Sequence, residues 1–398
     1  MTARILAVLL AALLCGLLPL GVQPARAGGS LTFGYVTRDG DPWFAEQRLY
    51  TGLKLREHRP AVEGAKTALA ESRVIGRAAG LTFGLVERQL PAQGDPAALA
   101  RELAAAGAGI VLLDLPRTPL LALAQAMLAE GGLPINLRLR DDDLRGSACL
   151  PGLLHAIPSE AMLSDALAQQ LARKGWRRVL VLAGDQPEDA RVLGAVEGSL
   201  AKFGLTLAAV RPFLLGNDPR QRSERNVALM TADEDYDVVW LVDSIGEFGR
   251  YVPYDTFLPR PVVGSEGLVA HAWHWTWERY GAPQLNQRFR KIAGRAMADE
   301  DYAAWVAVKA LIEAAVRTGS TDPGTLAAYV TSDAVNLDTY KGAIGSFRPW
   351  DGQLRQPILL ATHDAVIARA PLDGFLHQTN TLDTLGADRP ETRCKAAH

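Results

Sequence analysis

The chain has 398 residues, of which 48% are hydrophobic and 22% are charged, and its formal net charge is −2 at pH 7. A chain of this length is too long for one ordinary hydrophobic core and long enough for two domains. Because there is no excess of basic residues, electrostatic steering to nucleic acid or to anionic lipid is not expected.

The first 27 residues have the pattern of a secretory signal peptide. Arg4 precedes the apolar run Ile5–Leu18, and Ala25-Arg26-Ala27 forms a small-residue cleavage site. The apolar run is shorter than the roughly 20 residues that a membrane-spanning helix needs. A lipoprotein signal at Cys15 is the alternative, but Leu14 stands where such signals have a small residue. We therefore expect cleavage after Ala27, a periplasmic location, no membrane insertion of the mature chain, and a formal charge that changes from −2 to −4.

Strands and helices are predicted to alternate in the first part of the mature chain. Strands are expected at 31–37, 81–88, 109–113 and 133–137, and helices at 61–79, 96–106 and 118–130. In Gly94-Asp95-Pro96, Asp95 is the expected N-cap and Pro96 the first helical residue. The strand at 109–113 is apolar throughout, which is typical of parallel sheets that are buried on both faces. This order predicts a doubly wound parallel sheet.

A second alternation follows residue 158. Strands are expected at 178–183, 205–213, 237–242 and 261–264, helices at 159–174, 187–203, 220–231, 282–293, 300–318 and 323–330, and a β-meander at 341–368. The predicted fold class is therefore α/β with two lobes, each a doubly wound, mostly parallel sheet flanked by helices. The stretch 133–158 is the expected seam, or hinge crossover, between the lobes.

Two cysteines, Cys149 and Cys394, remain after cleavage. An even pair in an exported chain favours a disulfide, which would tie the C-terminus to the seam. Two unrelated free thiols and a metal-binding pair are the alternatives.

Ligands of doubly wound sheets bind outside the carboxyl ends of the strands. This rule predicts a cleft lined from the first lobe by Tyr35, Asp39, Asp114, Arg117, Asn136, Arg138 and Asp141, and from the second by Asp185, Gln186, Asp243, Glu247 and Tyr251. For each residue the alternative is a helix cap or a surface loop position.

Two groups of side chains could hold a metal. Asp141, Asp142 and Asp143 could bind a hard cation through oxygen, or the neighbouring Arg138, Arg140 and Arg145 could neutralise them. His271 and His274 lie near the acidic run 299–301, but we favour an aromatic packing segment for residues 271–277. The chain has no G-x-S-x-G, H-E-x-x-H or Walker motif and no nucleophile–base set, so neither an enzyme nor a cofactor is expected.

Several stretches resemble type I periplasmic binding proteins of the Leu/Ile/Val-binding kind. They are Gly94-Asp95-Pro96, the strand 237–242 followed by Ser244-Ile-Gly-Glu247, and Gly264-Ser-Glu266-Gly267. The resemblance implies a ligand-binding role for Glu266, because the acid of this G-x-E-G turn binds a ligand amino group in the amino-acid binders. The segments 153–159, 247–254, 347–360, 374–378 and 393–394 are similar to substrate-binding proteins of ABC transporters found with PQQ-dependent alcohol dehydrogenase systems.

This resemblance implies a periplasmic receptor that closes two lobes over a small molecule or a metal and delivers it to ABC permease and ATPase subunits. The expected first lobe comprises residues 28–152 and 265–345, the second 153–264 and 346–372, and a tail 373–398 follows. Amino-acid binders hold the ligand carboxylate with hydroxyl-bearing loops, but here the loops 114–119 and 138–143 keep only Thr118. A polar or charged ligand, or a metal complex, is expected instead of an amino acid. The alternative is a sensor or accessory protein that docks to a dehydrogenase, a cytochrome or a sensor kinase.

Overall fold

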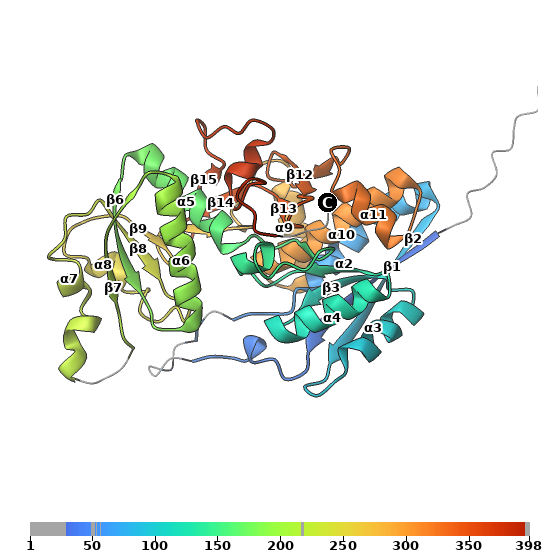
Figure 1. Cartoon of the computed structure of the whole chain (residues 1–398), viewed down its shortest axis with the longest axis horizontal. Coiled ribbons are helices and arrows are strands. Elements are labelled where there is room, and N and C mark those ends of the chain that lie inside the picture. The colour runs from blue at the N-terminus through green and yellow to red at the C-terminus, as the bar shows by residue number, and fades with distance from the viewer. Residues whose placement is uncertain (1–28, 49–51, 53, 56, 216–218, 395–398) are drawn as a thin grey trace, which may run out of the picture.

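The structure is a computed structural model that describes residues 29–48, 52, 54, 55, 57–215 and 219–394. The predicted signal peptide lies outside these residues. Two parallel sheets, each flanked by helices, lie at opposite ends of the molecule, with the C-terminal segments between them (Figure 1). Within the described residues, none of the helices combines the length and the apolar character needed to cross a membrane.

The first sheet is parallel, with strand order β2-β1-β3-β4-β5. Its strands are β1 (Gly29–Arg38), β2 (Leu81–Leu90), β3 (Ile110–Asp114), β4 (Leu133–Asn136) and β5 (Leu154–His155). One face packs on α2 (Val62–Ala79), α9 (Ala282–Ala293), α10 (Asp299–Thr318) and α11 (Pro323–Val330). The other face packs on α3 (Pro96–Ala105) and α4 (Arg117–Ala129), which explains why β3 is apolar at both its even and odd positions.

The second sheet is also parallel and has the order β7-β6-β8-β9. Its strands are β6 (Arg178–Ala183), β7 (Thr206–Pro212), β8 (Val238–Val242) and β9 (Val262–Gly264). Helices α5 (Glu160–Lys174) and α6 (Pro187–Lys202) cover one face, and the short α7 (Val227–Met230) and α8 (Val252–Asp255) lie at the other (Figure 1). The first lobe is defined here as the first sheet together with the helices that share its core. The second lobe is defined in the same way from the second sheet. The residue-level lobe boundaries stay a prediction.

Two predictions about local structure are wrong. Residues 220–231 do not form one helix. A 3-10 helix, Pro219–Arg225, ends at Arg225, and Asn226 is the N-cap of a separate short helix. The Asn226 side chain accepts a hydrogen bond from the Leu229 amide at 3.0 Å, which begins a new helix where a continuous one was expected. A strand that was not predicted, β10 (Val269–His271), pairs antiparallel with β14 (Ile358–Ala361).

The predicted antiparallel strands within 341–368 are confirmed, but as parts of two sheets and not as one meander. β11 (Leu337–Asp338), β12 (Ile344–Phe347) and β13 (Leu354–Arg355) form one antiparallel sheet, and β14 with β15 (Val366–Ala370) belongs to another, which also contains β10. The predicted helix caps are also confirmed, since the Asp95 carboxylate accepts from the Ala97 amide and the Ser159 hydroxyl accepts from the Met162 amide.

The chain passes between the two lobes three times, as the membership of core residues shows. The first passage lies between Ile157, in the core of the first lobe, and Met162, in the core of the second. The second passage lies between Ala270, in the core of the second lobe, and Ala272, in the core of the first. The third passage lies between Leu354, in the first core, and Ile358, in the second. The first passage falls at the predicted seam.

The C-terminal tail (373–394) runs back over the seam and is held there. The predicted disulfide between Cys149 and Cys394 is confirmed, with a Cα–Cα distance of 5.5 Å. Within the tail, Asp383 is 1% exposed and pairs with Arg348 and Arg355, each at an N–O distance of 2.8 Å. The tail therefore joins the segment before β14, α5 and the seam through covalent and ionic contacts.

Candidate ligand-binding cleft

The carboxyl ends of β1 and β3 meet at a buried pair, Tyr35 and Asp114. The Tyr35 hydroxyl donates to Asp114 Oδ2 at 2.6 Å, and the Ala61 amide donates to the same oxygen at 3.2 Å. Both side chains are almost fully buried, and burial, aided by Asp114, raises the pKa of Tyr35 well above its usual value. Through these hydrogen bonds, the pair joins β1, β3 and the start of α2. A ligand contact by either residue stays a prediction.

Arg138, after β4, lies against the loop that follows β1. Its Nη1 donates to Asp41 Oδ2 at 2.6 Å, and its guanidinium lies 4.8 Å from the centre of the Trp43 ring. A buried arginine keeps its charge at lowest cost when it has such a carboxylate and a ring face. Asp41 and Trp43 were not among the predicted residues, although Asp41-Pro42-Trp43 has the Asp-Pro signal of a helix start.

Asn136, at the end of β4, shapes the loop that carries Arg138. Its Oδ1 accepts from the amides of Arg138 and Leu139, and its Nδ2 lies 3.0 Å from His155 Nδ1. The side chain is fully buried. Asn136 thus fixes the loop between β4 and the seam, and its predicted contact with a ligand stays untested.

The three consecutive aspartates have separate partners. Arg117 donates to Asp141 at 3.0 Å and binds both oxygens of Asp143, while Asp142 accepts from the Ala161 amide at the start of α5. The expected neutralisation by the flanking arginines is confirmed only for Arg145, whose charge acts on Asp142 and opposes the rise in its pKa that burial causes. Arg138 pairs with Asp41 instead, and Arg140 pairs with Asp299. Within the described ranges, no group of three or more His, Cys, Asp or Glu side chains could hold a metal ion.

Two of the polar contacts between the lobes lie close to this loop and to the loop after β1. Arg191, on α6, lies with its Nε 3.5 Å from Asp141 Oδ1. Arg250, after β8, donates from Nη2 to the Lys54 carbonyl at 3.0 Å. Arg191 and the Arg117–Asp141 pair therefore lie where the two lobes face each other.

In the second lobe, Asp243 closes the loop after β8. Its carboxylate accepts from the amides of Gly246 and Gly249, both at 2.8 Å, and its own amide donates to the Ser265 hydroxyl at 2.8 Å. Burial raises the pKa of Asp243, while these amide donors oppose the rise. Asp243 therefore sets the position of Glu247 and of the turn that carries Glu266, and its direct contact with a ligand stays a prediction.

The predicted residues that remain accessible are Asp39, Asp185, Gln186, Glu247 and Glu266, together with Tyr251, which is 50% exposed. Asp185 accepts from Gln186 Nε2 at 2.7 Å. Within the described part of the chain, the carboxylates of Asp39, Glu247 and Glu266 have no hydrogen bond or ion pair. These three are consequently the predicted acids with the most capacity to bind a ligand donor, and Glu247 and Glu266 are the two in the second lobe.

A cavity of about 840 Å³ lies beside the passages between the lobes. It is lined by Glu57–Glu63, by Arg140 after β4, by residues 271 and 273–275 after β10, and by Ile292–Glu300 before α10. Its volume is that of a small-molecule site. The predicted packing role of residues 271–277 is confirmed for Trp273 and Trp277, which are buried, whereas Trp275 is 44% exposed at the cavity.

Arg140 lies at the centre of the charges in this cavity. Its Nη2 donates to Asp299 Oδ2 at 2.9 Å and lies 3.6 Å from Glu300, whereas its buried Nη1 has no partner among the described residues. Burial raises the pKa of Glu300, and at Asp299 the His271 ring and Arg140 outweigh burial and lower the pKa. Burial also lowers the pKa of His274 to about 4, so that ring is neutral at pH 7. In the sequence, residues 299 and 300 are candidates only for a metal site with His271 and His274. Their contact with Arg140 was not predicted, because it joins segments far apart in the sequence.

Glu160, in the first turn of α5, provides a test of these electrostatics. Burial raises its pKa from 4.5 to about 7, against the opposing charge of Arg140. Because the folded state holds this proton more tightly than the unfolded state, stability due to this group is lost as the pH rises from 4.5 to about 7. Glu160→Gln should therefore gain at least about 1 kcal/mol in unfolding free energy relative to the wild type over that range. Urea unfolding of the variant and the wild type at pH 4.5 and at pH 7 measures this gain. A difference in unfolding free energy that does not change with pH would contradict the raised pKa of Glu160.

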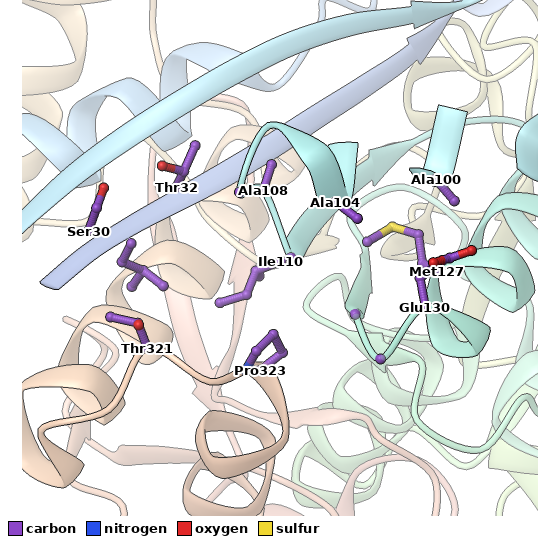
Figure 2. A pocket seen from close by; sticks show the side chains of 15 residues that line it. Ser30, Thr32, Ala100, Ala104, Ala108, Ile110, Met127, Glu130, Thr321 and Pro323 are labelled. Carbon is purple, nitrogen blue, oxygen red and sulfur yellow. The ribbon is translucent and has the colours of Figure 1, made fainter. Parts of the chain in front are cut away.

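Two other cavities lie elsewhere, and the second of them includes the predicted residue Asp141. One of about 300 Å³ lies at the amino-terminal edge of the first sheet, where Ser30 and Ile110 begin their strands and Met127 and Glu130 end α4 (Figure 2). This is the edge opposite to the carboxyl ends. Another, of about 900 Å³, lies between the Asp141–Asp143 loop, α5, α6 and the tail residue Glu391.

Comparison with known proteins supports the fold. No protein-family model and no curated protein matches the chain. Among solved structures, it is similar to a branched-chain amino acid ABC transporter periplasmic ligand-binding protein from Burkholderia xenovorans LB400, with TM-score 0.69, 15% identity, and coverage of 92% of this chain and 99% of the other. It is similar to a periplasmic binding protein from Burkholderia mallei, with TM-score 0.64, 15% identity, and coverage of 93% and 99%. A substrate-binding protein from Desulfitobacterium hafniense, in complex with Leu, has TM-score 0.61, 18% identity, and coverage of 85% and 99%.

The fold of this chain is therefore that of the two-lobed periplasmic binding proteins, as the sequence predicted. At these identities the similarity concerns the fold, and the ligand has to be inferred from the residues of the cleft.

Proposed function

We propose that this protein is the periplasmic solute-binding component of an ABC transporter and that it acts without catalysis. The observation that carries the proposal is the arrangement of two parallel sheets that are joined by three passages of the chain. This arrangement supports hinge closure over a ligand at the carboxyl ends of the strands. Solved structures with the same fold include ligand-binding and substrate-binding proteins of ABC transporters.

We further propose that the ligand is small and polar or charged. The groups that support this are the unpaired carboxylates of Glu247 and Glu266 and the charged cavity around Arg140, Asp299 and Glu300. The loops after β3 and β4 place arginines and aspartates where amino-acid binders have hydroxyls, and these side chains are already paired with one another. The segments 347–360 and 247–254 support the narrower proposal of a transporter linked to PQQ-dependent alcohol oxidation.

A ligand panel tests this function by thermal unfolding of the mature protein. The panel contains amino acids, alcohols, organic acids, PQQ, and di- and trivalent metal ions. A ligand at about one hundred times its Kd should add ~2.7 kcal/mol to the unfolding free energy. If no member changes the unfolding temperature, solute binding is contradicted for these classes, and mass spectrometry of molecules that co-purify with the protein extends the search.

Glu247→Gln and Glu266→Gln are expected to weaken binding of the ligand found in the panel. Each substitution removes a charge-assisted hydrogen bond, which should raise Kd roughly tenfold or more. Titration calorimetry of each variant measures the change. Glu197→Gln, at an exposed position of α6, is the matched control and should bind as the wild type does. Unchanged affinity in both cleft variants would place the ligand elsewhere, with the cavity around Arg140 as the next site to test.

A sensor or accessory protein is the second candidate, because the second lobe has exposed aromatic residues after β8. Tyr254 is 86% exposed and Phe257 is 61% exposed. Exposed aromatic side chains are typical of protein-docking surfaces. A panel without any thermal shift, combined with binding to a periplasmic dehydrogenase, cytochrome or sensor kinase that Tyr254→Ser weakens, would favour this candidate over transport.

A further inference from the structure

One buried pair of side chains, Lys341 and Gln356, contacts the second and third passages between the lobes and the residue directly before the first. Lys341 Nζ donates to the Ala272 carbonyl, in the second passage, at 2.8 Å and to Gln356 Oε1, in the third passage, at 2.7 Å. Gln356 Nε2 then donates to the Ala156 carbonyl, directly before the first passage, at 2.9 Å. Three segments that are far apart in the sequence are thus joined by three hydrogen bonds through two side chains.

The chemical setting of this pair is unusual for a lysine. Lys341 and Gln356 are both 0% exposed, and the Lys341 amine lies 4.3 Å from the centre of the Tyr302 ring. Burial lowers the pKa of Lys341 well below its usual value, although Asp299 opposes the change. A buried lysine is costly unless its hydrogens are satisfied, and here two carbonyl-type acceptors and a ring face surround the amine. An apolar residue would fill the same space at lower cost, so the amine is explained by what it connects.

Another glutamine strengthens the contact between the first and third passages. Gln353 Nε2 lies within hydrogen-bond distance of the carbonyls of His155, at 3.2 Å, and Ile157, at 3.0 Å. Arg145 donates to Gln353 Oε1 at 2.9 Å and also to the Ile157 carbonyl at 3.0 Å. The second passage is joined to the third by the antiparallel pairing of β10 with β14, at His271 and Leu359, and Lys341 adds a side-chain link from the second passage to Gln356.

We propose that Lys341 and Gln356 form a hinge pin, which holds the three passages at fixed separations so that the lobes rotate about one axis. The inference rests on the proposed function, because a hinge pin matters only in a protein whose lobes move. Without the pin, the second passage keeps its β10–β14 pairing with the third but loses this side-chain link to the first, so the lobes can slide as well as rotate. The pin therefore determines how well the two halves of the cleft meet when the lobes close.

The test measures the distance between the lobes in the absence of ligand. Spin labels are attached to cysteines introduced by Arg101→Cys on α3 and Glu197→Cys on α6, both exposed positions, after the native disulfide has formed. Pulsed electron paramagnetic resonance then compares the labelled protein with and without Lys341→Met. We expect a broader distance distribution with additional populations in the variant. A distribution that matches that of the protein with Lys341 would overturn the proposal.

Lys309→Met is the matched control. Lys309 lies on α10 within the first lobe, where its Nζ lies 3.4 Å from Ser72 Oγ, so its loss should leave the distance distribution unchanged. An equal broadening in this control would overturn the proposal, because general destabilisation would then explain both results. If Lys341→Met does not fold, Gln356→Leu, which removes the contacts to Lys341 and Ala156, is measured in its place under the same criteria. The measurement uses no ligand, so a failure of the ligand panel would not alter its outcome.

Discussion

Replacing Asp383 with alanine is expected to lower the free energy of unfolding by about 3–5 kcal/mol, because two buried arginines would lose their shared carboxylate. Arg348 and Arg355 both donate to Asp383 Oδ1 at 2.8 Å, and Arg348 is 1% exposed. Asp351 Oδ2, which lies 3.8 Å from Arg348 Nη1, would balance part of that charge, whereas the main-chain carbonyls of Leu382 and Leu385 are neutral. Urea unfolding of the variant measures the loss.

Asp383→Asn is the control for shape, because it keeps the volume and an oxygen acceptor but removes the negative charge. The free energy of unfolding of Asp383→Asn should lie between that of the wild type and that of Asp383→Ala. If Asp383→Ala unfolds at the same urea concentration as the wild type, the Arg348–Asp383–Arg355 cluster does not hold the tail in place.

Removing the disulfide with Cys149→Ser and Cys394→Ser is expected to cost about 2–5 kcal/mol of unfolding free energy. The bond joins residues 245 positions apart, so it restricts the unfolded chain strongly. Reduction of the wild type by dithiothreitol should give a loss of similar size and should make the tail beyond Asp383 more accessible to protease. Free thiols at both positions in the oxidised wild type, or equal stability of the double variant, would contradict this role.

Features that depend on neighbouring residues could be predicted from the sequence. The Asp95 and Ser159 caps, the fully apolar β3 and the alternation of strands and helices all follow from local patterns. The pairing of Cys149 with Cys394 could be predicted because, after signal-peptide cleavage, no other cysteine remains to compete.

Features that depend on distant segments could not be predicted. Strand β10 has three residues, and its partner β14 follows about ninety residues later in the chain, so no local pattern marks it. Residues 220–231 contain good helix formers, but residues 220–225 are all charged or polar and offer no apolar side chain to bury, so no long helix forms.

The candidate site shows the same limit. The carboxyl-end rule predicts one edge of each sheet, but not the direction in which each side chain at that edge points. Asn136 and Asp114 turn into the protein and satisfy main-chain amides, whereas Glu247 and Glu266 remain without partners. The partner of Asp141 was missed for a related reason: Arg117 begins α4, and only the parallel pairing of β3 with β4 brings it to the aspartates.

The interleaving of the two lobes along the chain has a consequence for the order in which the protein folds. Helix α10 supplies much of the core beneath β1 and α2, yet its residues follow theirs by more than 200 positions. Such non-local contacts give a high contact order, which slows folding. The first lobe therefore cannot complete its core as an autonomous N-terminal unit during synthesis, and this core stays open until α10 is available. If the chain is exported as its sequence predicts, this delay keeps its N-terminal lobe unfolded while it is threaded through a translocation channel.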